Sequence, residues 1–233
     1  MKSSLFLVFF LYLIWACGSK SDKNEATTQD STIKAATDSA GIEESPNNFY
    51  CIPGIQAGTV KANSSEASLK ELLGAENVMR DSVYIGEGFY EKGTTLFKGT
   101  PEEAQILWKD TINFAKPDNV LIRPAEGKPN EWLVEGGIKI GMTLKELEKI
   151  NGKPFSVSGF GWDYGGFVAD WKGGKLDGKD GISNLVVRFG YDYNDEKLNA
   201  FAEKVMGEGP FPSNNSAMQK LNPKVVEISI RFN

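Results

Sequence analysis

A short helix with both ends marked is the sequence feature that most constrains the fold. Thr143 and Glu146 have the spacing of a capping box, in which each side chain accepts a backbone N–H of the first turn. Three apolar positions then share one helix face: Leu144, Leu147 and Ile150. Asn151-Gly152 and Pro154 predict its end. Because a helix of about two turns is marginal alone, it must pack on another element.

The residues that follow predict a hairpin. Residues 156–171 alternate in character, and Gly165-Gly166 favours a two-residue turn. Counting outward from this turn places five aromatic side chains on one face: Phe160, Trp162, Tyr164, Phe167 and Trp171. The other face carries Gly159, Gly161, Asp163, Val168 and Asp170. We therefore expect one aromatic face and one face of glycine and carboxylate.

The N-terminus predicts export. Residues 1–4 are cationic, and the apolar run 5–15 is shorter than the about 20 residues that span a membrane. The sequence Ile14-Trp15-Ala16-Cys17-Gly18 resembles the lipobox of bacterial lipoproteins. That resemblance implies a signal peptide over residues 1–16 and a lipid on Cys17. The alternative is an ordinary secretory signal with a chance cysteine.

Residues 17–48 are predicted to be the lipid anchor and a disordered tether. They are mostly small, polar or charged, so burial cannot offset the entropy of ordering them. A coil of this length reaches about 30 Å. The other cysteine, Cys51, lies in an apolar run and is expected to be buried, with a reactive thiol as the alternative.

A second capped helix indicates a repeat. When Gly74 is aligned with Gly152, residues 65–74 match residues 143–152. The N-cap residues, the apolar positions and the final glycine then coincide: Ser65 with Thr143, Ser68 with Glu146, Leu69 with Leu147 and Leu72 with Ile150. Strands are predicted after each helix. The sequence therefore predicts an α+β fold of two tandem units, 49–126 and 127–233, each a short helix on an antiparallel sheet of about four strands.

Two features distinguish the second unit. An additional amphipathic helix is predicted near 195–206, where Asn194 or Asp195 can cap an apolar face and Gly207 can end it. In the last strand the apolar residues Val226, Ile228, Ile230 and Phe232 alternate with Glu227, Ser229 and Arg231. This alternation is typical of a sheet with one solvated face.

The run IGMTLKELEKINGKPF resembles the opening of the small lipoprotein of the outer-membrane β-barrel assembly machinery. Two helix-plus-sheet units resemble the secreted β-lactamase inhibitory protein, although its disulfides are missing here. With GFGWDYGG, the chain also resembles a family of bacterial lipoproteins of unassigned function. The likeness covers residues 136–171 well and 58–110 loosely. It implies a curved sheet that binds proteins, with no catalytic residues to transfer.

The composition leaves little room for catalysis. The chain has no histidine, which removes imidazole-based active sites and most zinc sites. In the predicted hairpin, Asp163 and Asp170 are diagonal neighbours about 7–8 Å apart, a spacing compatible with glycoside hydrolysis. The alternative is a solvated sheet face. Residues 177–181 do not have the spacing of a calcium loop, so no metal or cofactor is expected.

The aromatic set is either core or a binding site, and Trp108 has the same two interpretations. The candidate binding residues are Trp162, Asp163, Tyr164, Asp170 and Trp171. The net charge of −5, with acids and bases interspersed, disfavours nucleic acid as a partner. We expect a lipid-anchored envelope protein, facing the periplasm or the surface from the outer membrane, that binds a protein without catalysis. The alternative is glycan binding or cleavage.

Overall fold

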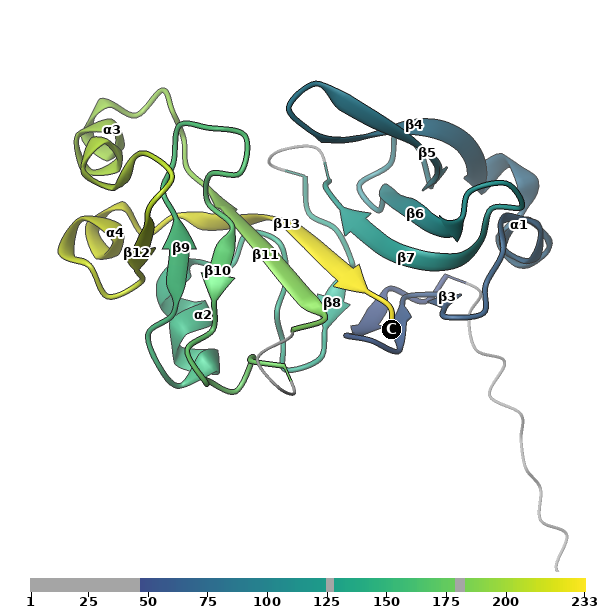
Figure 1. The fold of residues 1–233 in the computed structure, drawn as a ribbon, viewed down its shortest axis with the longest axis horizontal. Coiled ribbons are helices and arrows are strands. Elements are labelled where there is room, and N and C mark those ends of the chain that lie inside the picture. The colour runs from purple at the N-terminus through teal and green to yellow at the C-terminus, as the bar shows by residue number, and fades with distance from the viewer. Residues whose placement is uncertain (1–46, 125–127, 179–182) are drawn as a thin grey trace, which may run out of the picture. The chain divides into compact units, whose positions relative to one another are not determined.

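The computed structural model describes residues 47–124, 128–178 and 183–233, which belong to one compact unit (Figure 1). The predicted signal peptide, Cys17 and all but the last residues of the tether lie outside the described ranges. None of the described helices is long and apolar enough to cross a membrane.

The predicted α+β class is confirmed. The largest sheet has six antiparallel strands in the order β11-β13-β7-β6-β5-β4. Its strands are β4 Val78–Gly86, β5 Phe89–Leu96, β6 Ala104–Asp110, β7 Ala115–Ile122, β11 Leu185–Gly190 and β13 Lys224–Arg231. Strands from both predicted units therefore join in one sheet, in which β7 and β13 are neighbours.

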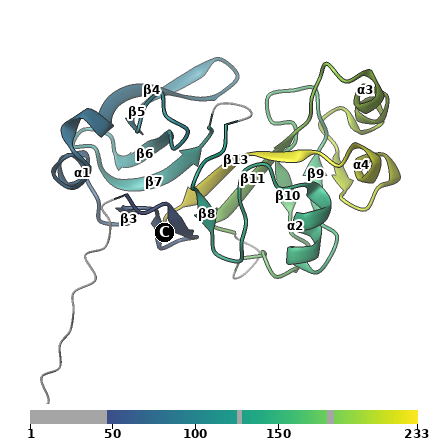
Figure 2. The ribbon, with the colours of Figure 1, turned by 180° about the vertical axis from the view of Figure 1, so that it is seen from behind.

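Two smaller sheets flank this one (Figure 2). The four-stranded sheet has the order β3-β2-β1-β8, with β1 Tyr50–Ile52, β2 Gln56–Ala57, β3 Val60–Lys61 and β8 Leu133–Val134. The three-stranded sheet has the order β10-β9-β12, with β9 Ser156–Ser158, β10 Val168–Asp170 and β12 Pro210–Pro212. Because β1 pairs with β8, the first strand of the described chain is bonded to the second half of the sequence.

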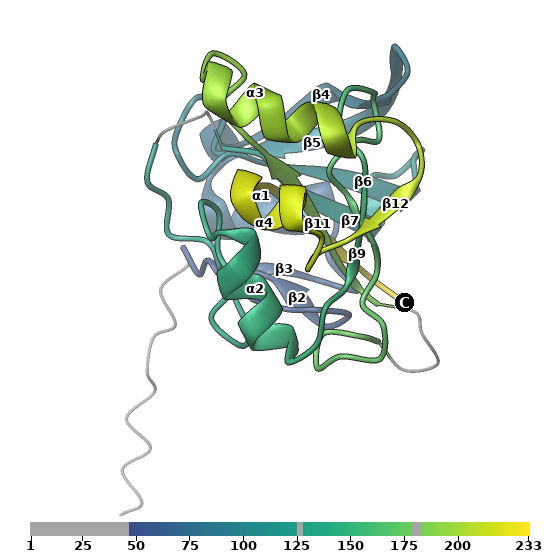
Figure 3. The same ribbon diagram turned by 90° about the vertical axis from the view of Figure 1, so that its left-hand side faces the viewer.

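Short helices lie at both ends of the unit. They are α1 Glu66–Leu73, α2 Leu144–Asn151, α3 Glu196–Ala202 and α4 Ser216–Leu221, with 3-10 turns η1 Ala75–Asn77 and η3 Glu203–Val205. Figure 3 shows α2, α3 and α4 together at the end opposite α1. The inserted helix is confirmed, with Asp195 as its cap. Helix α4 and strand β12 were not predicted from the sequence.

Both predicted capping boxes are present. In α2 the Thr143 N–H donates to Glu146 Oε2 over 2.8 Å, and Gly152 ends the helix at a φ of 74°. In α1 the pair is Ser65 and Ser68. The apolar face of α1 differs from the prediction: Leu73 is buried and Leu72 is 53% exposed, because the buried positions are spaced by four residues from Leu69.

The predicted two-residue hairpin is wrong. Strand β9 pairs Val157 with Val168 and Ser156 with Asp170, which leaves residues 159–167 as a loop. The two glycines bond to strand β11 instead. The Gly165 carbonyl accepts from Arg188 Nε over 2.9 Å, and the Gly166 carbonyl accepts from the Phe189 N–H over 2.8 Å. These long-range bonds replace the local turn.

The last strand is not solvated on one face. Ile228, Ile230 and Phe232 are buried as predicted, but Val226 is 39% exposed. On the opposite face, Glu227 and Ser229 are buried. A register shift between Arg188 and Phe189, opposite this strand, interrupts the alternation. The second face of the sheet is therefore covered at Glu227 and Ser229, and the residues around Glu227 belong to the candidate site.

Candidate binding surface

The predicted aromatic residues divide between core and surface. Trp171 is 4% exposed, and its ring centroid lies 5.3 Å from that of Phe155. Phe160 is also buried, as is Trp108 on strand β6. Trp162 is half-buried and Tyr164 is 40% exposed. Of the predicted binding aromatics, the structure leaves these last two at the surface.

The two predicted carboxylates have separate partners. Asp163 Oδ2 accepts the Glu87 N–H over 2.8 Å. Asp170 accepts from both the backbone N–H and the Nζ of Lys172, each over 2.7 Å, and these hydrogen bonds lower the pKa of its carboxyl group. The diagonal pairing of the two aspartates depended on the two-residue turn. Without that turn, the geometric basis for an acid–base pair is absent.

Two segments contact the arginines that surround Glu227 on the six-stranded sheet. Strand β5 pairs with β6 only over residues 93–96, so residues 82–92 project as a two-stranded ribbon. We call residues 82–92 the ribbon and residues 159–167 the loop. The Glu87–Asp163 hydrogen bond joins them. In Figure 1 the tip of the β4–β5 ribbon reaches toward the part of the chain between β9 and β10.

A buried carboxylate connects both segments to the sheet. Glu227 on β13 is 5% exposed, and its Oε1 lies 3.1 Å from Arg123 Nη2. Arg123 Nη1 also donates to the Tyr84 carbonyl of the ribbon over 2.8 Å. Arg188 Nη1 lies 3.9 Å from Glu227 Oε2, and Arg188 Nη2 donates to the Asp163 carbonyl over 3.1 Å. Arg123 therefore connects Glu227 to the ribbon, and Arg188 connects it to the loop.

This arrangement presents an aromatic surface that we define by five residues: Tyr84, Phe89, Tyr90, Trp162 and Tyr164. Phe89 and Tyr90 are 65% and 64% exposed. The rings of Tyr84 and Tyr90 are 5.3 Å apart, and those of Trp162 and Tyr164 are 5.4 Å apart. Tyr164 lies against the ribbon at Gly86, where an added Cβ would lie 3.2 Å from the Tyr164 hydroxyl.

Three members of the aromatic surface were not predicted. Tyr84, Phe89 and Tyr90 flank the segment Gly86-Glu87-Gly88, where Gly86 and Gly88 both have positive φ values. A turn at these glycines, with aromatic residues on both sides, is a sequence signal for a projecting hairpin. The sequence could have revealed the ribbon, but not the loop that lies beside it.

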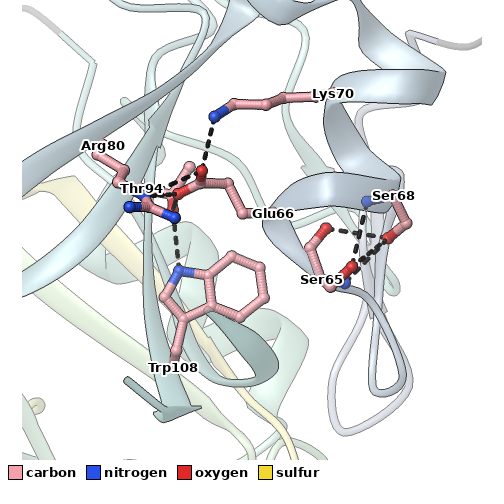
Figure 4. Close-up of polar contacts among 7 residues, drawn as sticks. All are labelled: Ser65, Glu66, Ser68, Lys70, Arg80, Thr94 and Trp108. Atoms are coloured by element: carbon pink, nitrogen blue, oxygen red, sulfur yellow. Dashed lines mark hydrogen bonds and ion pairs between the residues drawn. The ribbon is translucent and has the colours of Figure 1, made fainter. Parts of the chain in front are cut away.

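A second polar cluster lies under α1 (Figure 4). Glu66 is buried, and Lys70 Nζ lies 2.6 Å from its Oε1. Arg80 Nε donates to both carboxylate oxygens over 3.1 Å, and the Thr94 hydroxyl donates to Oε2 over 3.1 Å. Trp108 Nε1 in turn donates to Thr94 Oγ1 over 2.9 Å. The buried carboxylate thus links the helix to strands β4, β5 and β6.

Opposing effects set the pKa of Glu66. Burial alone would raise the pKa of the carboxyl group, but the hydrogen bonds from Lys70, Arg80 and Thr94 outweigh it and the net shift is downward. Glu66 is therefore ionised at neutral pH. A carboxylate held in this state by fixed donors is suited to structure rather than to proton transfer.

The cysteine is buried, and a surface hollow lies beside α1. Cys51 is fully buried as predicted, and desolvation raises its pKa to about 12. A shallow hollow of about 440 Å³ lies beside α1, and its lining includes Lys61, Ser64 and Ser68. Within residues 47–124, 128–178 and 183–233, no three acidic or cysteine side chains gather closely enough to hold a metal ion.

We found no family model that matches the sequence, no curated protein similar to it and no solved structure similar to its fold.

Proposed function

We propose that this chain is an exported, lipid-anchored envelope protein that binds another protein through its aromatic surface and catalyses no reaction. The observation that carries the proposal is the exposure of Phe89 and Tyr90 on the ribbon and of Tyr164 on the loop, two segments joined by the Glu87–Asp163 hydrogen bond and tied to the sheet through Glu227. The lipobox-like sequence at Cys17 and the polar tether support the location in the envelope.

The chemistry of the aromatic surface suits a protein partner. Tyrosine and tryptophan supply much of the binding energy at protein interfaces, because they offer large apolar area with few rotatable bonds. Apolar side chains exposed together commonly mark interaction sites. The bonds from Arg123 and Arg188 to the ribbon and loop hold these rings in place before a partner arrives, which lowers the entropic cost of association.

We also propose that residues 49–126 and 127–233 are tandem units, as the sequence predicts. In each half the N-cap residue of the helix pairs with the first residue of the last strand: Ser65 with Ala115, and Thr143 with Lys224. The hydrogen bonds there correspond. Glu66 N–H donates to the Phe114 carbonyl and Leu144 N–H to the Pro223 carbonyl, each over 2.8 Å.

The strand order supports the same correspondence. Strands β4, β5, β6 and β7 follow α1 as antiparallel neighbours. Strands β9, β10, β11 and β13 follow α2, and the bridge between Phe167 and Arg188 connects the β10 side to β11. The last strands of the two halves, β7 and β13, lie side by side. This pairing would make one curved surface from two units.

A lipidation experiment tests the location. Cells producing the wild type or Cys17→Ala are grown with radiolabelled palmitate and then fractionated. We expect label and membrane association in the wild type, and neither in Cys17→Ala. Equal labelling of both proteins would refute the anchor while leaving the binding proposal open.

A crosslinking experiment tests the binding. A photoreactive residue replaces Tyr90 in the full chain, and envelopes are irradiated. We expect one discrete protein adduct, which the additional change Phe89→Ala weakens about tenfold, the loss typical of a single interface anchor. Tyr50→Ala is the matched control. The exposed fraction of Tyr50 equals that of Tyr164, but Tyr50 lies in the four-stranded sheet. Binding to isolated glycan without a protein adduct would support the glycan alternative instead.

A further inference from the structure

The outer edge of strand β4 has a counterpart in the second half of the chain. Strand β4 is an end strand of the six-stranded sheet. Like β9, it is the first strand after a capped helix that ends at a glycine, Gly74 for α1 and Gly152 for α2. The two strands differ in what lies on their outer edges.

The chain itself covers the edge of β9. Residues 191–223 join β11 to β13 and include β12, whereas only residues 111–114 join β6 to β7. Strand β12 pairs antiparallel with β9, with Phe211 opposite Val157. The Ser213 N–H donates to the Phe155 carbonyl over 2.7 Å, and the Gly159 N–H to the Gly209 carbonyl over 3.2 Å. The first half contains no such insertion.

Four residues of β4 direct their backbone groups outward. The Tyr84 carbonyl points away from β5, because it accepts from Arg123. Alternate residues of a strand direct N–H and C=O to the same side, so Val78, Arg80 and Ser82 also face outward. The Ser82 N–H agrees with this direction, because it bonds to the Asp81 carboxylate over 2.9 Å. Across the described ranges, no strand pairs with this edge.

The charges beside the edge indicate what would fit there. Lys70 and Arg80 share the single carboxylate of Glu66, so this group carries one excess positive charge (Figure 4). The side chains of Lys70 and Arg80 are 37% and 64% exposed. Directly opposed residues of paired strands have side chains on the same face. A residue opposite Arg80 would therefore lie next to both cations.

We propose that β4 residues 78–82 bind an extended segment of a partner protein as an added antiparallel strand, with an acidic side chain opposite Arg80. The backbone groups of Arg80 and Ser82 and the Val78 carbonyl supply the hydrogen bonds, as in other cases of strand addition. The Val78 N–H takes no part, because it already donates to the Ala75 carbonyl. The incoming carbonyl replaces the Asp81 carboxylate at the Ser82 N–H. Asp81 keeps Lys98 and Thr95 as partners. Strand β12, which spans three residues, is the internal template.

A second copy of the chain fits this edge poorly. The antiparallel register that uses Val78, Arg80 and Ser82 of both copies would place Val78 opposite Ser82 and Arg80 opposite Arg80. Shifting one strand by two residues would place Asp81 opposite Asp81. Like charges directly opposed across strands are destabilising. The favoured occupant is therefore a different, acidic segment.

A peptide selection with matched variants tests this proposal. Random 12-residue peptides displayed on phage are selected on the full chain carrying Cys17→Ala. The selected peptides are then measured against Ser82→Pro and Ser82→Ala. Proline removes the outward N–H but is tolerated on an edge strand, and the preceding residue is already extended. Alanine keeps the N–H.

We expect peptides enriched in acidic residues that bind Ser82→Ala like the parent and bind Ser82→Pro at least tenfold more weakly. On peptide binding, hydrogen exchange should slow at the amides of Arg80 and Ser82. Circular dichroism checks that Ser82→Pro is folded. If this variant does not fold, the hydrogen exchange of the parent protein with bound peptide decides the test. Equal binding to both variants, protection at other residues or a selection that enriches no peptide would overturn the proposal.

The outcome is separable from that of the aromatic surface. Tyr90→Ala should leave peptide binding at residues 78–82 unchanged, because Tyr90 pairs with Tyr84, which lies beyond that segment. Loss of the crosslinked adduct with retained peptide binding, or the reverse, would therefore identify which proposal has failed.

Discussion

Glu66 shows most directly how one side chain stabilises this fold. Glu66→Gln removes the charge that Lys70 and Arg80 share but keeps an acceptor for Thr94. Because hydrogen bonds to charged groups contribute about 1.5–3 kcal/mol, we expect the free energy of unfolding to fall by about 2 kcal/mol. Urea unfolding measures this. Lys70→Ala is the control, with an expected loss below about 1 kcal/mol, since its pair is partly exposed. Equal losses for the two variants would contradict the assignment.

The pH dependence of Glu66 follows from its lowered pKa. The ordinary value is 4.5 and the folded value is lower, so the folded state favours the ionised form. The resulting stabilisation is fully present at pH 7 and is lost as the pH falls below 4.5 through the folded pKa. We therefore expect the stability difference between wild type and Glu66→Gln to shrink from pH 7 to pH 3. A difference that grows on acidification would contradict the sign.

Cys51 should be inert in the folded protein. Its pKa of about 12 and its complete burial leave almost no thiolate at pH 8, and the thiolate is the reactive form. In a Cys17→Ala background, we expect iodoacetamide to label Cys51 only after denaturation, as followed by mass spectrometry. Fast labelling under native conditions would show that the strand containing Cys51 opens readily.

At the scale of elements, the contact between β5 and β6 depends on Gly93. A Cβ at this position would lie 2.5 Å from the Ile106 carbonyl oxygen and 2.6 Å from Val83 Cγ2. Gly93→Ala should therefore destabilise the protein by about 1–3 kcal/mol through overpacking. Gly209→Ala is the matched control, because nothing lies within 4 Å of the added Cβ, and it should be nearly neutral. Thermal unfolding of the two variants distinguishes them.

The sequence was sufficient for elements whose signals are local. The ends of α1 and α2 depend on side chains within one turn of each helix, so Ser65, Thr143 and the glycines after each helix could be recognised directly. The inserted helix had the same kind of signal in Asp195. The last helix, α4, was missed because it has only six residues and lies among prolines that favour an irregular loop.

Elements set by distant contacts could not be predicted in this way. Gly165-Gly166 favours a tight turn locally, but Arg188 and Phe189 bond to both glycine carbonyls and hold them in a longer loop. The candidate site has the same origin. Trp162 and Tyr164 were found in the sequence, whereas Tyr84 and Tyr90 join them only through folding of residues more than 70 positions away.

At the scale of the molecule, strands from the two halves of the chain pair with one another in the same sheets. Val120 and Ile122 on β7 pair with Ile230 and Ile228 on β13, and all four side chains are buried. At the other side, β1 pairs with β8. Separating the halves would expose each apolar side chain at a cost of about 1.5–3 kcal/mol. That loss is large against the 5–15 kcal/mol stability typical of a whole domain.

We therefore expect residues 49–126, produced alone, to show no cooperative unfolding transition, whereas the full chain shows a single one. Urea titrations followed by circular dichroism and by tryptophan fluorescence should coincide for the full chain, since tryptophans lie in both halves. Mixing the separately produced halves should restore the transition, because β7 and β13 would pair again across the new termini. A cooperative transition in the isolated fragment would show that the tandem units are independent domains, and the shared sheet would then be a contact between them rather than a condition for folding.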